Sequence, residues 1–509
     1  MVQGDDYFEE IDIAYLADAM EKGELKSVDL VRFYLDRIAR IDSGKGLRSI
    51  LCLNGKALDI AERLDRERSE GVIRGPLHGI PILLKGNIDT GDDMPTTAGS
   101  LALAGRLASS DSLLAARLRA SGAVILGKAN LSEWANFRSS RSSSGWSAEG
   151  GQARNPYVLD RSPSGSSSGS AIAVSANFCA AAVGTETDGS IVSPASANGI
   201  AGLKPTKGVI PGKGIIPISA SQDTAGPMAR NVRDAAILLA AMKDPDALRD
   251  LDERRTVERL CDINSIRPLE GVRLGIARNF CGFDSATDNL FQEACKALAE
   301  LGAVLCDSDL KEESGFGEAE YEVLLYEFKA GIAEYLSAPP APSSPAGLSG
   351  ERPPASLEDL IAFNAANKEG EMPYFGQEIF EASQAKGGLG DEAYGKARAF
   401  CLAASRDRGI DAALAKDRLD GLIAPTAGPA WKIDHVLGDR PGGGGCSSLP
   451  AAAGYPHVTV PMGFVKRLPV GLSIFGAAGR DIALMRIAGI FESALQVRRK
   501  PGFLTTLEN

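Results

Sequence analysis

Two serine-rich segments of the chain could supply a nucleophile for acyl transfer. One is SPSGSSSGSAI at residues 162–172, and the other is GTETDGSIVSPAS at residues 184–196, in which Gly189 precedes Ser190. The first continues into small apolar residues, so its glycines indicate close approach of backbone rather than a flexible linker. In the second, a loop of small residues can turn consecutive backbone N–H groups toward one point, as a developing oxyanion requires.

Lys85 is the residue that could act as the base for a serine nucleophile. It follows the apolar run IPILL at residues 80–84, where burial would lower the pKa of the amine and leave it neutral. A lysine at the end of an apolar strand more commonly keeps its charge in solvent, and only the two serine segments favour a catalytic role. The three histidines, His78, His435 and His457, lie far from both segments in sequence. A Ser-His-Asp triad through His457 is therefore the weaker alternative.

The chain carries no sequence motif for a nucleotide or a metal. The phosphate-binding pattern G-x-x-x-x-G-K-[ST] is absent. The eight cysteines are widely separated, with neither a C-x-x-C pair nor Cys/His pairs at zinc spacing, and we expect most of them as reduced core residues. We therefore expect no cofactor and no metal.

Strand and helix patterns alternate along the chain around these residues. Short apolar runs behind glycine or proline predict buried strands, and amphipathic runs predict helices. Ser27 is expected as the N-cap of one helix, which the pattern extends to Ile41. This order indicates an α/β fold with a mixed or parallel sheet. The expected strands are 80–84, 123–127, 179–183, 421–425, 457–461 and 470–475, and the expected helices are 11–20, 27–41, 111–120, 171–176, 232–242 and 482–495.

An ordered series of motifs resembles the amidase signature family. The segments GSSSGSAIAV, GTETDGSIVSPAS, GLKPTKG and SQDTAGPMAR carry the resemblance, with GPLHGIPILLKGNID upstream and AAAGYPHVTVPMGF downstream. The run SEWANF followed by GWSAEGGQARNP is similar to bacterial peptide amidases. The resemblance implies one amidase signature domain over residues 1–509, with a central mixed β-sheet covered on both faces by helices. N-terminal helices are expected over about 1–70, and a less family-like insertion over about 311–398, with an exposed proline-rich run at 337–355.

The resemblance also assigns roles residue by residue. It implies a Ser-cisSer-Lys triad in which Ser190 is the nucleophile, Ser166 the bridging serine in a cis peptide, and Lys85 the base. The family separates its two serines by 24 positions, as Ser166 and Ser190 are separated here, which favours Ser166 over Ser167 or Ser168. The oxyanion hole is then expected to consist of the backbone N–H groups of Thr187, Asp188, Gly189 and Ser190.

One departure from the family pattern concerns the nucleophile loop. Many members carry an aspartate and an arginine that pair with each other, and this chain has Glu186 and Val192 at those positions. Support for the loop must therefore come from elsewhere in this chain. The partner of Glu186 is open at this point.

The resemblance implies an amidohydrolase that cleaves the C-terminal amide of peptides to free acid and ammonia through a Ser190 acyl-enzyme. The alternatives are an amidase of small aliphatic or aryl amides, and a component of a tRNA-dependent amidotransferase. A catalytically silent binding protein is disfavoured because all three triad residues are present. Five polar or aromatic residues of the motif loops are candidates for substrate binding, although core packing would explain the three aromatic ones equally well: Trp134, Asn136, Phe137, Trp146 and Gln222.

Composition limits the partners and the compartment. A net charge of −11 without a clustered Lys/Arg block disfavours nucleic acid as a partner. No apolar run reaches the roughly 18 residues that suggest a membrane span, and the first residues lack the features of a secretory signal. We expect a cytoplasmic protein without membrane contact, or a periplasmic or secreted one if a signal has been removed. The expected substrate is a small peptide amide or another amide, and the expected state is a monomer or a homo-oligomer.

Overall fold

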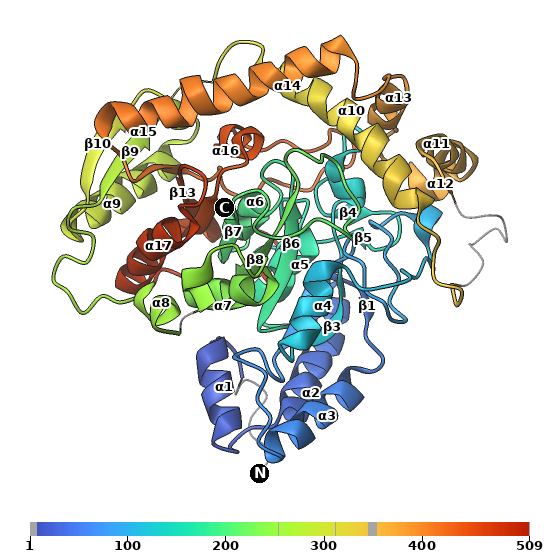
Figure 1. The fold of residues 1–509 in the computed structure, drawn as a ribbon, viewed down its shortest axis with the longest axis horizontal. Coiled ribbons are helices and arrows are strands. Elements are labelled where there is room, and N and C mark those ends of the chain that lie inside the picture. The colour runs from blue at the N-terminus through green and yellow to red at the C-terminus, as the bar shows by residue number, and fades with distance from the viewer. Residues whose placement is uncertain (1–7, 253, 311, 345–353, 508–509) are drawn as a thin grey trace.

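The computed structural model describes residues 8–252, 254–310, 312–344 and 354–507. Its central feature is a mixed sheet of eleven strands in the order β1-β3-β2-β6-β8-β7-β12-β13-β11-β9-β10, covered by helices on both faces (Figure 1). These strands are β1 (Ile50–Leu53), β2 (Pro81–Lys85), β3 (Val124–Ala129), β6 (Ala181–Glu186), β7 (Ala201–Lys204), β8 (Thr224–Ala229), β9 (Arg273–Ala277), β10 (Val304–Ser308), β11 (Gly421–Pro425), β12 (His457–Val465) and β13 (Leu468–Phe475). A separate hairpin joins β4 (Trp146–Ser147) and β5 (Gly151–Gln152).

The predicted α/β class and mixed sheet are confirmed. Strand β2 lies between β3 and β6 and is parallel to both, whereas β6, β8, β7, β12, β13 and β11 form successive antiparallel pairs. Each of the six predicted strands corresponds to a strand of this sheet, with the prediction for β11 matching its bounds. All residues of β2, β3 and β6 are buried, which is why each strand begins with a run of apolar residues.

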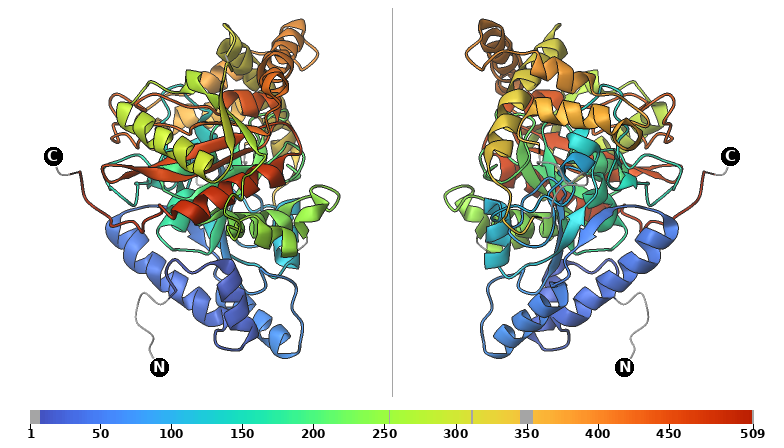
Figure 2. Two further views of the ribbon diagram at one scale, coloured as in Figure 1. Left: turned by 90° about the vertical axis from the view of Figure 1, so that its left-hand side faces the viewer. Right: turned by 90° about the vertical axis from the view of Figure 1, so that its right-hand side faces the viewer.

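Helices surround the sheet (Figure 1 and Figure 2). Helices α1–α3 and helices α10–α14 lie at opposite ends of the molecule, and Figure 2 shows this arrangement from both sides. Between them, α7 and α17 pack against each other and on the sheet, and α5 and α6 pack together on it. The bounds are α1 (Ile13–Glu21), α2 (Ser27–Arg37), α3 (Ala57–Ser69), α4 (Leu113–Ala120), α5 (Ser168–Ser175), α6 (Val192–Ala197), α7 (Val232–Met242), α8 (Arg254–Arg259), α9 (Ser285–Glu300), α10 (Phe316–Ser337), α11 (Leu357–Ala366), α12 (Lys368–Glu371), α13 (Glu378–Gln384), α14 (Glu392–Ser405), α15 (Asp411–Asp417), α16 (Ser448–Ala453) and α17 (Asp481–Leu495).

The predicted N-cap of α2 is wrong by one position. Ser27 is the first residue of the helix, and its hydroxyl donates to the carbonyl oxygen of Gly79 at 2.7 Å. The backbone N–H groups of Ser27 and Val28, which have no partner within the helix, donate instead to the carboxylate of Asp65 in α3. The N···O distances are 2.8 Å for Ser27 and 3.1 Å for Val28. A tertiary contact with a neighbouring helix has taken the place of a local cap.

The segment predicted as an insertion packs on the rest of the protein. Phe328 of α10 and Phe380 of α13 share one hydrophobic cluster with Trp134 and Phe137 of the SEWANF motif. The proline-rich run 337–355 lies partly outside the described residues, since 345–353 are not among them. Within the described ranges, no helix combines the length and apolar character needed to cross a bilayer.

Candidate active site

Three loops meet at one edge of the sheet. Lys85 is the last residue of β2, and Thr185 and Glu186 end the adjacent parallel strand β6, so the carboxyl ends of both strands lie together. The segment that contains Ser166 leads into α5, and its Ser167 N–H donates to the carbonyl oxygen of Ser190 at 3.1 Å. The sheet thus brings the three predicted triad loops together.

Lys85 and Ser166 are in direct contact. The Lys85 side chain is completely buried, and its Nζ lies 2.7 Å from Ser166 Oγ. The Gly165–Ser166 peptide bond is cis, as the resemblance implies. Burial lowers the pKa of Lys85 from its ordinary value of 10.5 to about 7, and the carboxylates of Asp223 and Glu186 only partly offset this effect. A substantial fraction of the amine is therefore neutral near neutral pH and able to accept a proton.

Thr185 and Asn87 complete the surroundings of the amine. Lys85 Nζ lies 2.9 Å from Thr185 Oγ1 and 3.2 Å from the Thr185 carbonyl oxygen. Asn87 Nδ2 donates to Thr185 Oγ1 at 3.0 Å. A neutral amine has two N–H groups and one lone pair; with both N–H groups directed at Thr185, the lone pair faces the hydroxyl of Ser166. Sequence reasoning missed both residues, although they stand in the motifs GTETDGS and LLKGN.

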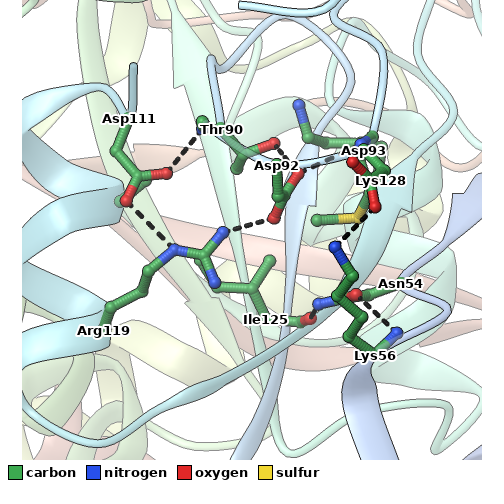
Figure 3. A network of polar contacts seen from close by, with 12 residues as sticks. Asn54, Lys56, Thr90, Asp92, Asp93, Asp111, Arg119, Ile125 and Lys128 are labelled. Carbon is green, nitrogen blue, oxygen red and sulfur yellow. Dashed lines mark hydrogen bonds and ion pairs between the residues drawn. The ribbon is translucent and has the colours of Figure 1, made fainter. Parts of the chain in front are cut away.

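The loop after Lys85 is held by a polar network (Figure 3). Arg119 of α4 pairs with Asp92, and its Nε donates to Asp111 at 3.0 Å. Asp111 also accepts the backbone N–H of Gly91 at 2.7 Å, and Thr90 donates to Asp92 at 2.9 Å. These bonds fix residues 90–92 against α4 and so restrict the segment that begins at Lys85.

The nucleophile loop presents free backbone donors. Ser190 is 8% exposed, and Gly189 has a φ of +75°, which glycine adopts without strain. Among the described residues, none accepts a hydrogen bond from the backbone N–H of Thr187, Asp188, Gly189 or Ser190. Nor does the Ser190 hydroxyl bond to a described residue, so Ser166 and Ser190 are brought near through backbone rather than through their hydroxyl groups.

The predicted substrate-binding residues fall into two sets. Trp134 and Phe137 are buried against α13 and α10, with ring centroids 5.5 Å from Phe380 and 5.1 Å from Phe328 respectively. Trp146 is buried at 5.1 Å from the ring of Phe375. Core packing therefore accounts for the contacts of all three aromatic side chains.

The two polar candidates differ in their contacts. Gln222 Nε2 lies 3.3 Å from the carbonyl oxygen of Thr187 and donates to Glu320 at 2.8 Å. Asn136 has a φ of +71°, its Nδ2 lies 3.4 Å from Ser144 Oγ, and its Oδ1 is buried without a hydrogen-bond partner. Gln222 thus contacts the nucleophile loop, while Asn136 keeps an unused acceptor.

The three histidines make contacts away from the two serine segments. His78 Nε2 lies 2.9 Å from the carbonyl oxygen of Leu64, and His435 stacks on Tyr374 with centroids 3.9 Å apart. His457 is completely buried at 2.6 Å from Ser473, and burial lowers its pKa to about 3. His457 is therefore not the base of a Ser-His-Asp triad.

Comparison with known proteins shows which proteins this chain is similar to. The family model described as Amidase matches residues 29–485. The native peptide amidase from Stenotrophomonas maltophilia has 46% sequence identity and a TM-score of 0.88, over 98% of this chain and 99% of that one. An amidase candidate of Schizosaccharomyces pombe (strain 972) is 37% identical over 97% of this chain and 87% of its own length. A component of the glutamyl-tRNA(Gln) amidotransferase of Symbiobacterium thermophilum is 34% identical over 92% of this chain and 94% of its own.

Proposed function

The chain belongs to the amidase signature family and is a hydrolase that acts on amides, and we propose that it removes the C-terminal amide of peptides as ammonia. The observation that carries the proposal is the buried Lys85 amine in contact with Ser166, beside a loop of free N–H groups. The choice of peptide amides is supported by the 46% identity to the peptide amidase, which exceeds the 34% identity to the amidotransferase component.

In the proposed reaction, neutral Lys85 takes a proton from Ser166 while Ser166 takes the proton of Ser190. The Ser190 oxygen then bonds to the amide carbon, and the carbonyl electron pair moves to the oxygen. The N–H groups of residues 187–190 stabilise that oxyanion. Collapse of the intermediate breaks the C–N bond, and the proton held on Lys85 returns through Ser166 to the departing ammonia. Water activated along the same path hydrolyses the acyl-enzyme to the peptide acid.

The test is an assay of the purified chain alone. The chain is incubated with a C-terminally amidated dipeptide, without ATP, glutamine or tRNA, and ammonia release is measured beside Ser190→Ala. We expect ammonia from the parent and none from the variant. Ammonia from both would refute the role of Ser190. Silence from the parent would refute a self-sufficient peptide amidase, and small aliphatic and aryl amides would be assayed next.

The second candidate is a component of a tRNA-dependent amidotransferase, favoured by the coverage of that relative over nearly its whole length. Such a component works with protein partners and passes its ammonia on. Activity that appears only after partner proteins co-purify would favour this candidate. Ammonia release by the isolated chain from a dipeptide amide would exclude it.

A further inference from the structure

Glu186 lies at the base of the nucleophile loop without the arginine partner that many members provide. It is the last residue of β6, and only 1% of its surface is exposed. Its Oε2 accepts the backbone N–H of Ile191 at 2.7 Å and that of Val192 at 3.0 Å. These two donors directly follow Ser190. The carboxylate therefore links the two ends of the turn that carries the nucleophile.

This link determines which backbone groups of the turn stay free. Glu186 uses the N–H groups of Ile191 and Val192, and Ser193 N–H donates to the carbonyl oxygen of Gly189 at 2.8 Å. The N–H groups between the two ends, at residues 187–190, make no hydrogen bond to the described residues. An acceptor fixed outside the turn thus leaves the donors inside it available for an oxyanion.

A carboxylate beside an oxyanion hole would oppose the developing negative charge unless a cation offsets it. Lys204, which ends β7, is that cation: it is 1% exposed and donates to the carbonyl oxygen of Tyr455. Burial raises the pKa of Glu186, and the nearby Lys204 charge only partly offsets this effect. The opposed charges allow a buried acceptor to hold the turn with a reduced penalty on the oxyanion.

We infer that Glu186 is a positioning residue for catalysis, whose carboxylate holds the nucleophile turn through Ile191 and Val192 in place of the aspartate–arginine pair. This inference rests on the proposed function, because it requires Ser190 to be the nucleophile. Glu186 is expected to align the nucleophile turn in the transition state rather than to bind substrate. Loss of its carboxylate should therefore lower kcat and leave KM nearly unchanged.

The test compares three substitutions at one position. Glu186→Gln keeps an oxygen acceptor at the same reach, Glu186→Met keeps the length without an acceptor, and Glu186→Asp keeps the charge on a shorter side chain. We expect kcat within about threefold of the parent for Gln, roughly tenfold lower for Asp, and roughly 100-fold lower for Met. KM is expected within about threefold of the parent in all three.

Glu492 provides a matched control. It is another carboxylate that accepts a backbone N–H at a helix start, from Val232 of α7 at 2.8 Å, but it lies on α17 and is half-buried. Glu492→Met should lower the melting temperature and leave kcat within about twofold of the parent. A general loss of folding would instead lower activity in both methionine variants.

Two results would overturn the inference. One is a folded Glu186→Met protein with kcat within twofold of the parent; the other is a loss that falls on KM instead of kcat. If the methionine variant does not fold, Glu186→Asp decides the question by the same two criteria. Active Ser190→Ala would refute the proposed function itself, whereas inactive Ser190→Ala beside fully active Glu186→Met would refute only the role of Glu186.

Discussion

The buried lysine predicts the shape of the pH–rate profile. With a pKa of about 7, roughly half of the Lys85 amine is neutral at pH 7, about one tenth at pH 6 and about one hundredth at pH 5. Because only the neutral amine can accept the proton of Ser166, kcat/KM should fall about tenfold per pH unit below 7 and level off above about pH 8. At the ordinary pKa of 10.5, roughly one amine in three thousand would be neutral at pH 7.

The assay is ammonia release from an amidated dipeptide at low substrate concentration, measured from pH 5 to pH 11 with Ser190→Ala as background. Lys128 offers a control, since it is also completely buried with a pKa lowered by burial, but it donates to the carbonyl oxygen of Ile88 at 2.6 Å. Lys128→Met should leave the midpoint of the acid limb in place, whatever its effect on the maximal rate. A parent profile still rising at pH 10, or one without an acid limb, would refute the reasoning.

Substitutions of Lys85, Thr185 and Trp134 test three further features of the structure. Lys85→Met should abolish turnover yet be more stable than the parent at pH 7. The Lys85 amine binds its proton more weakly in the folded than in the unfolded state, so the unfolding free energy of the parent increases as the pH rises from about 7 to 10.5. The stability difference between the variant and the parent should therefore shrink over this range. Urea unfolding at pH 7 and 10 tests this, and a constant stability difference would contradict it. Thr185→Val removes one of the acceptors that orient Lys85, and should lower kcat about tenfold or more with KM nearly unchanged, whereas an equal rise in KM would indicate a binding role. Trp134→Ala opens a cavity against Phe380 and should cost about 3–5 kcal/mol of unfolding free energy; thermal melting within a degree of the parent would exclude that packing role.

The sequence predicts the strands that carry the site because their patterns are local. The run IPILL has apolar residues on both faces, as a strand buried by helices on both sides requires, and β2 covers Pro81–Lys85. Helix α7 matches its predicted bounds, since Asn231 caps it by accepting the N–H of Asp234 at 2.7 Å. Where the helix cap, the apolar periodicity and the residues that end the helix all lie within one segment, the predicted bounds of the helix are confirmed.

Long-range contacts carry no such local signal. Strand β8 inserts between β6 and β7 although it follows both in sequence, and nothing in its composition specifies that place. The contact of Thr185 with Lys85 joins residues 100 positions apart. The Ser27 hydroxyl suits a local cap, yet the carboxylate of Asp65, 38 positions away, takes that role. In each case a residue or strand far away in sequence determines the local structure, and a single sequence does not identify that partner.

The segment 311–398 is anchored to the SEWANF motif by a buried guanidinium. Arg138 is fully buried; its Nε lies 2.7 Å from Glu133 Oε1, and it donates to the carbonyl oxygens of Glu371 and Gly376 at 2.8 Å each. Removing one partner of such a pair leaves an uncompensated charge in the interior and costs roughly 3–5 kcal/mol. The motif and the segment are therefore coupled energetically, although their sequences resemble the family to different degrees.

Ser132 connects the SEWANF motif to the segment that contains Ser166. Ser132, next to Glu133, donates its backbone N–H to the carbonyl oxygen of Ser166 at 3.0 Å, and its hydroxyl accepts the N–H of Gly145 at 2.8 Å. A change in the segment can therefore shift the bridging serine and the loop of Trp146 without altering a triad residue. Since the triad must stay constant for the reaction, we expect substrate differences between this protein and relatives with the same triad to arise from the segment 311–398 and from the motif it holds.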